Sequence, residues 1–345
     1  MNHVLGTSAA AVRAAPLLLI DLETEEGFSG RSYLFCYLRG AASAMAAMVA
    51  EVERMAKGER TPPRELWEKL AKRFRLIGVQ GIVRMAMAGF DVAYWDALAR
   101  AAGKPLVEFL GGTVKPIRAY NSNGLGLMGL EALAREADEL LEGGFRGVKL
   151  RLGYPTLEED LAAVKAVRAR LPTGVSLMVD YNQALSFDEA LRRGRALDGE
   201  GLAWIEEPIR HDDYRGAATL ASELATPIQI GENFSQPYAL EEAIAAKACD
   251  LVMPDLERIG GVTGWLRAGE IARTANMKMS SHLFPEVSAH LLAVTPTADW
   301  LEYVDWAAPL LEEPIRIVDG EAGIPSRPGN GLEWNQKAIE AFRIG

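Results

Sequence analysis

Cysteine is scarce in this chain. Of its 345 residues only Cys36 and Cys249 are cysteines, and both lie in apolar contexts, SYLFCYL and KACDLVM. A disulfide framework of the kind that holds small secreted proteins together is therefore excluded, and we interpret both residues as buried thiols. Free thiols are typical of a reducing compartment, so the expected location is the cytoplasm.

Long apolar runs and basic stretches are also missing. No run reaches the roughly 20 apolar residues that a membrane-spanning helix needs. The first residues, MNHVLGTSAAAVRAAPLLLIDLE, lack the basic start and the long apolar core of a signal peptide. The net charge is −10 and no face rich in Lys and Arg emerges, so neither nucleic acid nor a membrane is an expected partner.

What the chain does contain is a regular series of charged residues near the ends of six apolar runs. The runs are FRGVKLRL, VSLMVDYN, LAWIEEP, PIQIGEN, DLVMPD and MKMSSH, and they carry, in this order, Lys149 with Arg151, then Asp180, Glu206, Glu232, Asp255 and His282. From Asp180 onward the spacings are 26, 26, 23 and 27 residues, which is about what a strand, a loop and a helix need together. Charges that recur at strand ends facing one mouth are typical of a (β/α)-barrel active site.

The segment before this series has a different rhythm. Residues 17–38 are predicted to form two strands around the turn-rich EEGFSG, and residues 41–110 form amphipathic helices. From about residue 115 strands and helices alternate, which favours an α/β fold with a parallel barrel. The expected divisions are an α+β capping domain, a catalytic barrel, and a loop-rich tail that returns to the capping domain: residues 1–112, 113–304 and 305–345.

Three of the carboxylates lie on consecutive predicted strands. Without a cation, Asp180, Glu206 and Glu232 would repel one another at a shared mouth. Oxygen-only ligation selects a hard ion, and Mg²⁺ fits two or three carboxylates with substrate and water. Strand alternation puts Glu206 on the same face as Trp204 and turns Glu207 the other way. We therefore predict one Mg²⁺ per chain.

The neighbouring strands supply cations and a polar amide to the same mouth. Lys149 and Arg151 share a face, so they can hold a substrate carboxylate, and one of them could move a proton. Asp180 and Asn182 share a face in VDYN.

The histidines differ in their surroundings. His282 ends its strand beside Asp255, which ends the preceding strand, and adjacent strands lie about 5 Å apart. A carboxylate at this distance fixes the imidazole tautomer and raises its basicity. His290 is interpreted as a packed helix residue and His211 as a loop residue. Glu302 ends the eighth apolar run, where a protonated carboxyl could donate to a developing enolate oxygen.

The segments VDYNQ, WIEEP, GEN, MPD, IGGVTGW, MSSHLF, SAHLLA and TPTA, in their order and with near-identical spacing, resemble the mandelate racemase subgroup of the enolase superfamily. The resemblance covers nearly the whole chain. It implies a modified (β/α)₇β barrel under an α+β capping domain, with Mg²⁺ as cofactor and a small carboxylate as substrate. It also suggests a homo-oligomer, with an octamer as the candidate assembly.

The resemblance assigns the metal ligands and two substrate contacts. Asp180, Glu206 and Glu232 match the Mg²⁺ ligands. Asn182 matches a side chain near the metal and the substrate hydroxyl. Ser122, in AYNSNG, matches a serine that contacts the substrate carboxylate.

The resemblance also assigns the proton-transfer groups. Asp255 and His282 match the catalytic dyad, Glu302 matches the acid that bonds the substrate carboxylate, and Lys149 matches the first lysine of a Lys-x-Lys motif. The second lysine of that motif, the base for one enantiomer, is here Arg151. Arginine stays protonated, so it is a poor base and a good carboxylate clamp.

A second departure lies at the start, where the family's first cap strand and the beginning of its substrate-facing loop are missing or shortened before VLGTSAAAV.

The predicted reaction is the Mg²⁺-assisted removal of the α-proton of a 2-hydroxycarboxylate, through a metal-stabilised enolate, with His282 as the main base. Dehydration of an acid sugar needs only one strong base, whereas racemisation or epimerisation of a mandelate-like acid needs two, and both outcomes stay open. The alternative is a barrel that binds metal and carboxylate without turnover, against which the intact Asp255–His282 pair counts.

Overall fold

The computed structural model describes residues 3–8 and 10–344 of the chain. Its first part is a small hairpin, then an antiparallel strand pair, then helices. The elements are β1 (Leu5–Gly6), β2 (Ala11–Val12), β3 (Leu17–Glu23), β4 (Ser29–Phe35), α1 (Arg39–Ala56), α2 (Pro63–Arg73), α3 (Ile82–Ala101) and α4 (Leu106–Phe109). The predicted strand pair around EEGFSG and the helices after it are therefore present.

Eight parallel strands follow and form the barrel. They are β5 (Ile117–Asn121), β6 (Gly147–Arg151), β7 (Ser176–Asp180), β8 (Ile205–Glu206), β9 (Ile228–Ile230), β10 (Leu251–Val252), β11 (Lys278–Met279) and β12 (Leu301–Tyr303). Neighbours in sequence pair side by side from β5 to β11, and β12 pairs with β5. The ring closes at Met279, whose N–H donates to Thr297 O at 2.9 Å and whose carbonyl accepts from Asp299 N at 2.9 Å.

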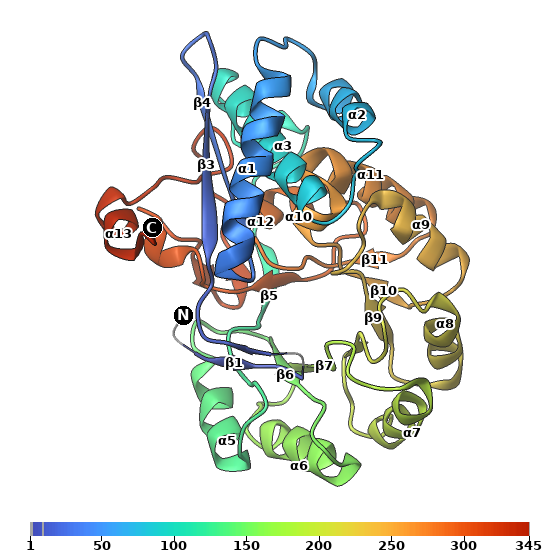
Figure 1. The fold of residues 1–345 in the computed structure, drawn as a ribbon. Coiled ribbons are helices and arrows are strands. Elements are labelled where there is room, and N and C mark those ends of the chain that lie inside the picture. Colours follow the sequence, from blue (N-terminus) through green and yellow to red (C-terminus); the bar gives the residue numbers. More distant parts are fainter. Residues whose placement is uncertain (1–2, 9, 345) are drawn as a thin grey trace.

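Helices cover the outside of the strands, as Figure 1 shows for the green and yellow part of the chain. They are α5 (Leu130–Glu139), α6 (Leu157–Arg168), α7 (Phe187–Leu197), α8 (Tyr214–Glu223), α9 (Pro237–Ala245), α10 (Leu256–Ile259), α11 (Gly261–Thr274) and α12 (Pro285–Ala293). The capping part lies against one side of this ring, with α3 near α10 and α11 (Figure 1). This is the expected modified (β/α)₇β barrel with an α+β capping domain.

The end of the chain adds an antiparallel hairpin to the first barrel strand and then returns to the capping part. After the 3₁₀ turn at Ala308–Leu310, it forms β13 (Ile317–Val318), β14 (Glu321–Ala322) and α13 (Gln336–Phe342). Asn330 Nδ2 donates to Arg31 O at 2.8 Å, and Trp334 Nε1 donates to Asp21 Oδ1 at 2.8 Å. These contacts support the proposed tail at 305–345, and we keep the divisions at residues 112 and 304 as proposals.

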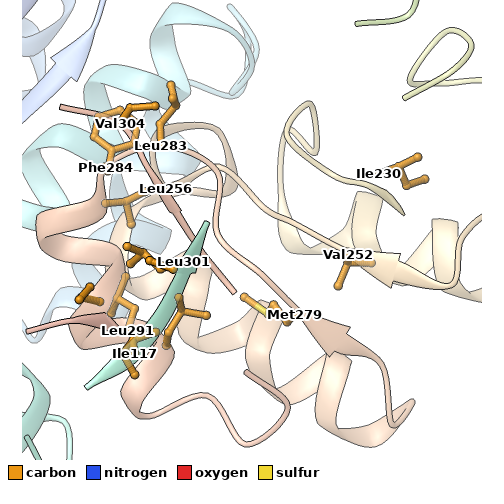
Figure 2. Packing of buried hydrophobic residues seen from close by; sticks show 14 of the residues in the cluster. Ile117, Ile230, Val252, Leu256, Met279, Leu283, Phe284, Leu291, Leu301 and Val304 are labelled. Atoms are coloured by element: carbon orange, nitrogen blue, oxygen red, sulfur yellow. The ribbon is translucent and has the colours of Figure 1, made fainter. Parts of the chain in front are cut away.

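The apolar core has two main parts. The larger lies between the strands and the helices of the barrel, and Figure 2 shows Ile230, Val252 and Met279 from three neighbouring strands within it. The smaller lies within the capping part, where β4 approaches α3 closely at Gly30. A Cβ atom on Gly30 would stand 1.9 Å from Ala93 O, so only glycine permits this contact.

Two further observations bear on the sequence predictions. Cys36 and Cys249 are both buried and unpaired. No helix in the described part of the chain is both long and apolar enough to cross a membrane.

The hairpin of β1 and β2 packs on barrel loops, since Ser8 Oγ donates to Tyr181 O at 2.7 Å and Leu127 N donates to Gly6 O at 2.8 Å.

Candidate active site at the barrel mouth

The three predicted metal ligands converge at the C-terminal ends of adjacent strands. Asp180 and Glu206 end β7 and β8 and stand opposite each other in the parallel register, and Glu232 follows β9. One carboxylate oxygen from each lies within 4.8 Å of the others. Asp180 and Glu206 are buried. A compact, buried, oxygen-only and anionic donor set fits Mg²⁺.

Asn182 stands directly beside this triad. The left-handed backbone at Asn182 (φ 44°) turns its N–H to Asp180 Oδ1 at 2.7 Å and its Nδ2 to Asp180 Oδ2 at 3.0 Å. Its Oδ1 is buried and has no hydrogen-bond partner among the described residues. An unpartnered buried acceptor is costly, so this oxygen is available to a ligand at the mouth.

Lys149 joins the metal ligands to Glu302. Its Nζ lies 2.6 Å from Glu206 Oε1, 2.8 Å from Glu302 Oε1 and 3.6 Å from Asp180 Oδ2. Burial alone would lower the pKa of Lys149, but these carboxylates raise it well above its usual value. Lys149 is therefore a cation shared by three acids.

Arg151 is engaged by the protein rather than turned freely to the mouth. Its Nη1 donates to the carbonyl oxygens of Ser122 and Gly124, each at 3.1 Å, and to Lys149 O at 3.3 Å. Its Nη2 donates to Ser122 Oγ at 2.7 Å, and only Nε is buried without a partner among the described atoms. These hydrogen bonds fix Ser122 in place. That Arg151 also holds a substrate carboxylate stays a prediction.

Ser122 connects Arg151 to Glu302 by hydrogen bonds. The Ser122 hydroxyl donates to Glu302 Oε1 at 2.7 Å, and Glu302 Oε2 accepts from Leu283 N at 2.9 Å. Burial raises the pKa of Glu302, but Lys149 and His282 outweigh burial and lower it to about 2. Without a ligand both oxygens of Glu302 accept hydrogen bonds, and a protonated Glu302 that donates to a developing enolate oxygen stays a prediction. A substrate carboxylate placed beside it would raise its pKa again.

The structure brings Asp255 and His282 together. Asp255 is the N-cap of α10, and its Oδ1 accepts from Glu257 N at 2.9 Å and Arg258 N at 3.0 Å. Its Oδ2 lies 2.7 Å from His282 Nδ1. His282 Nε2 faces the mouth, 3.1 Å from Glu232 Oε2 and 3.9 Å from Glu302 Oε2. The cap geometry fixes the carboxylate, and the carboxylate in turn orients the imidazole.

Glu232 is supported by a group of hydrogen-bonded polar side chains that the sequence analysis did not predict. Asn233 Nδ2 donates to Glu207 Oε2 at 2.8 Å and to Glu232 Oε1 at 3.2 Å. Arg258 Nη1 donates to Glu232 O and to Asn233 Oδ1, both at 3.0 Å, and its Nη2 donates to Tyr37 OH at 2.5 Å. The proximity of Asn233 and Arg258 to the series in sequence could have pointed to them. Tyr37, from the capping part, carries no such signal.

Aromatic rings gather where the capping part meets the mouth. The ring centroids of Phe35 and Tyr37 are 4.1 Å apart, and those of Phe35 and Trp306 are 5.0 Å apart. Trp306 follows β12 closely, so this group borders the site. Two other histidines lie as predicted: His290 is buried in α12 and its Nδ1 accepts from Val107 N, whereas His211 is exposed in the loop after β8.

Comparison with known proteins agrees with this architecture. Residues 2–111 match the model of the mandelate racemase/muconate lactonizing enzyme N-terminal domain, and residues 132–338 match an enolase C-terminal domain-like model. A solved enolase from alpha proteobacterium BAL199 with bound Mg is 44% identical, with a TM-score of 0.97 over 99% of this chain and 95% of that one. One from Bradyrhizobium, complexed with magnesium and mandelic acid, is 42% identical, with a TM-score of 0.95 over 100% and 95%.

A curated relative represents a second kind of chemistry. The L-talarate/galactarate dehydratase of Salmonella typhimurium is 31% identical over 323 residues, which are 93% of this chain and 81% of that protein.

Proposed function

Because the chain belongs to the mandelate racemase/muconate lactonizing enzyme family of the enolase superfamily, we propose that it removes the α-proton of a 2-hydroxycarboxylate with Mg²⁺ as cofactor. The observation that carries this proposal is the Asp255–His282 pair, in which His282 Nε2 lies 3.1 Å from Glu232 Oε2 of the carboxylate triad. A binding protein has no need of an oriented base at that position.

The proposed metal ligands are Asp180, Glu206 and Glu232. When bound, a divalent cation lowers the energy of the negative charge that develops on the substrate carboxylate. Lys149 and Glu302 lie 2.8 Å apart beside the triad, so together they can receive the other carboxylate oxygen, Lys149 by its charge and Glu302 once it is protonated. Asn182 Oδ1 is the proposed acceptor for the substrate 2-hydroxyl.

His282 is the proposed base. Its Nε2 takes the α-proton while Asp255, on Nδ1, stabilises the imidazolium that forms. In a dehydration the electron pair left on the α-carbon expels the β-hydroxyl, which leaves as water with the proton that His282 returns. The resulting enol tautomerises to a 2-keto acid.

Dehydration of an acid sugar is the outcome that the site supports best. It needs one base, and the position predicted for a second base holds Arg151, whose guanidinium is held by backbone carbonyls and does not accept a proton. Racemisation or epimerisation of an aryl hydroxy acid is the second candidate. It is favoured by the aromatic group of Phe35, Tyr37 and Trp306 and by the Bradyrhizobium relative that holds mandelic acid.

A substrate screen tests the proposal. The enzyme with Mg²⁺ is offered acid sugars and aryl 2-hydroxy acids in D₂O, and 2-keto product, optical rotation and α-deuterium are followed together. Deuterium in at least one substrate is expected. Binding of Mg²⁺ and carboxylates with no exchange in any of them would instead establish the binding barrel without turnover.

Assembly and location are also proposals. Leu76 is fully exposed and Ile77 is 67% exposed, and exposed apolar side chains next to each other support contact between copies of the chain. We propose a homo-oligomer, with the octamer as the assembly to test, and light scattering of wild type against Ile77→Asp measures it. A cytoplasmic location is supported by the two free, buried thiols.

A further inference from the structure

The floor of the site is a packed group of large side chains inside the barrel. Tyr120, Met178, Trp204 and Trp300 form a buried cluster of their own. The Trp204 and Tyr120 rings meet edge to face with centroids 5.4 Å apart, and Trp300 meets the same Tyr120 ring at 6.4 Å. Two tryptophans therefore share one packing partner, but only one of them lies next to the metal ligands in sequence.

Trp204 precedes Glu206 by two residues, so both side chains point to the same face of the strand, into the barrel. The Trp204 indole Nε1 donates to Glu206 Oε2 at 3.1 Å. Lys149 Nζ occupies the other oxygen, Oε1, at 2.6 Å. Trp204 is 1% exposed and Glu206 is fully buried.

The two donors to Glu206 differ in the number of acceptors that each of them serves. Lys149 is shared among Glu206, Glu302 and Asp180, and a substrate carboxylate would compete for it. The Trp204 N–H has Glu206 as its only acceptor among the described residues. When Lys149 turns to a substrate, the indole is thus the donor that keeps the carboxylate plane in place.

We propose that Trp204 is a positioning residue for the metal site, acting through Glu206. Mg²⁺ affinity then depends on the indole N–H and not only on the bulk of the ring. The inference rests on the proposed function, because it takes Glu206 as a metal ligand.

The test compares Trp204→Phe with Trp300→Phe. Both variants keep an aromatic ring against Tyr120, but only the first removes a donor from a metal ligand. Titration with Mg²⁺ alone, followed by calorimetry without substrate, is expected to show a dissociation constant about 10–100-fold higher for Trp204→Phe and unchanged for Trp300→Phe. Equal dissociation constants for the two variants overturn the proposal.

A shape-matched replacement covers the case in which Trp204→Phe does not fold. A benzothienyl analogue of tryptophan, introduced at position 204 and separately at position 300, keeps the bicyclic ring and exchanges N–H for sulfur. Weaker Mg²⁺ binding at position 204 alone supports the role of the N–H, and equal binding at both positions refutes it. A wild-type protein that binds no Mg²⁺ would instead overturn the proposed function itself, so the two failures are distinguishable.

Discussion

The capping part and the barrel place their polar side chains differently. Inside the capping part the buried cluster is apolar, with Val52, Leu70 and Met87 among its least exposed members. At the barrel mouth, Lys149 and Glu302 are each 1% exposed. Burying charge costs stability unless partners compensate. We propose that the barrel mouth accepts that cost to hold reactive groups, whereas the buried acids of α3, Asp91 and Asp96, accept hydrogen bonds that hold the fold together.

The two regions meet through polar contacts next to the site. Tyr33 OH donates to Glu286 Oε2 at 2.7 Å, and Phe35 N donates to Glu257 Oε2 at 3.1 Å. Tyr37 OH accepts from Arg258 at 2.5 Å. The capping part thus contacts the barrel beside the groups that we propose do the chemistry, all of which lie on the barrel. Changes in the barrel should affect the reaction itself, and changes in the capping part should affect which substrate fits.

The largest effect is expected from Glu206→Gln. The variant loses an anionic metal ligand and leaves Lys149 with one carboxylate fewer, so Mg²⁺ binding and activity should both disappear while the circular dichroism spectrum stays native. The same change at Glu207, which bonds Asn233, is the control and should leave Mg²⁺ binding measurable. Full activity of wild type in excess chelator would show that this site needs no metal.

His282→Asn should come next. Loss of the base is expected to reduce turnover and α-proton exchange by on the order of 10²–10⁴, with Mg²⁺ affinity retained. His211→Asn, at an exposed loop position, is the matched control and should exchange normally. If His282→Asn keeps near-native exchange, another residue is the base, and the role assigned to His282 at the barrel mouth is wrong.

The sequence predicts the barrel mouth well because each strand–helix unit repeats at nearly constant length. Regular spacing is enough to bring Asp180, Glu206 and Glu232 to one end, and to set Asp255 beside His282. These contacts are local to adjacent parallel strands, so the strand order alone determines them.

Contacts that depend on side-chain direction or on distant segments escape the sequence. The sequence predicts Arg151 as a substrate clamp, which stays a prediction, but it gives no sign that Arg151 Nη1 donates to the carbonyl oxygens of Ser122 and Gly124. The pKa of Glu302 is lowered chiefly by Lys149, a residue far from it in sequence. The pair Tyr37–Arg258 spans the boundary of two regions, and no periodic pattern relates the two residues.

A smaller, qualitative effect is expected at Arg151. Wild type should exchange the α-proton of only one enantiomer of a bound hydroxy acid, the one that presents it to His282. Arg151→Lys should gain slow exchange with the other enantiomer, since Lys149 beside it disfavours the protonated amine. Deuterium incorporation into each pure enantiomer measures this.

Arg151→Met is the control for that experiment. Both variants lose the bonds to Ser122 and Gly124, so their melting temperatures should fall together, but only the lysine variant can gain exchange. If wild type already exchanges both enantiomers at comparable rates, the one-base interpretation is wrong and racemisation becomes the better description.

The smallest effect is expected from Tyr37→Phe, and it tests the comparison directly. The change removes one hydrogen bond, worth about 0.5–1.5 kcal/mol, so KM should change by no more than about tenfold. Arg258 keeps its hydrogen bonds to Glu232 O and Asn233 Oδ1, so the Mg²⁺ dissociation constant should not change.

Arg258→Lys, whose ammonium does not reproduce the planar fork of the guanidinium, should weaken Mg²⁺ binding. Calorimetry on both variants decides. If Tyr37→Phe weakens Mg²⁺ binding as much as Arg258→Lys does, the capping part is itself a support of the metal site, and the division between packing and chemistry fails at that contact.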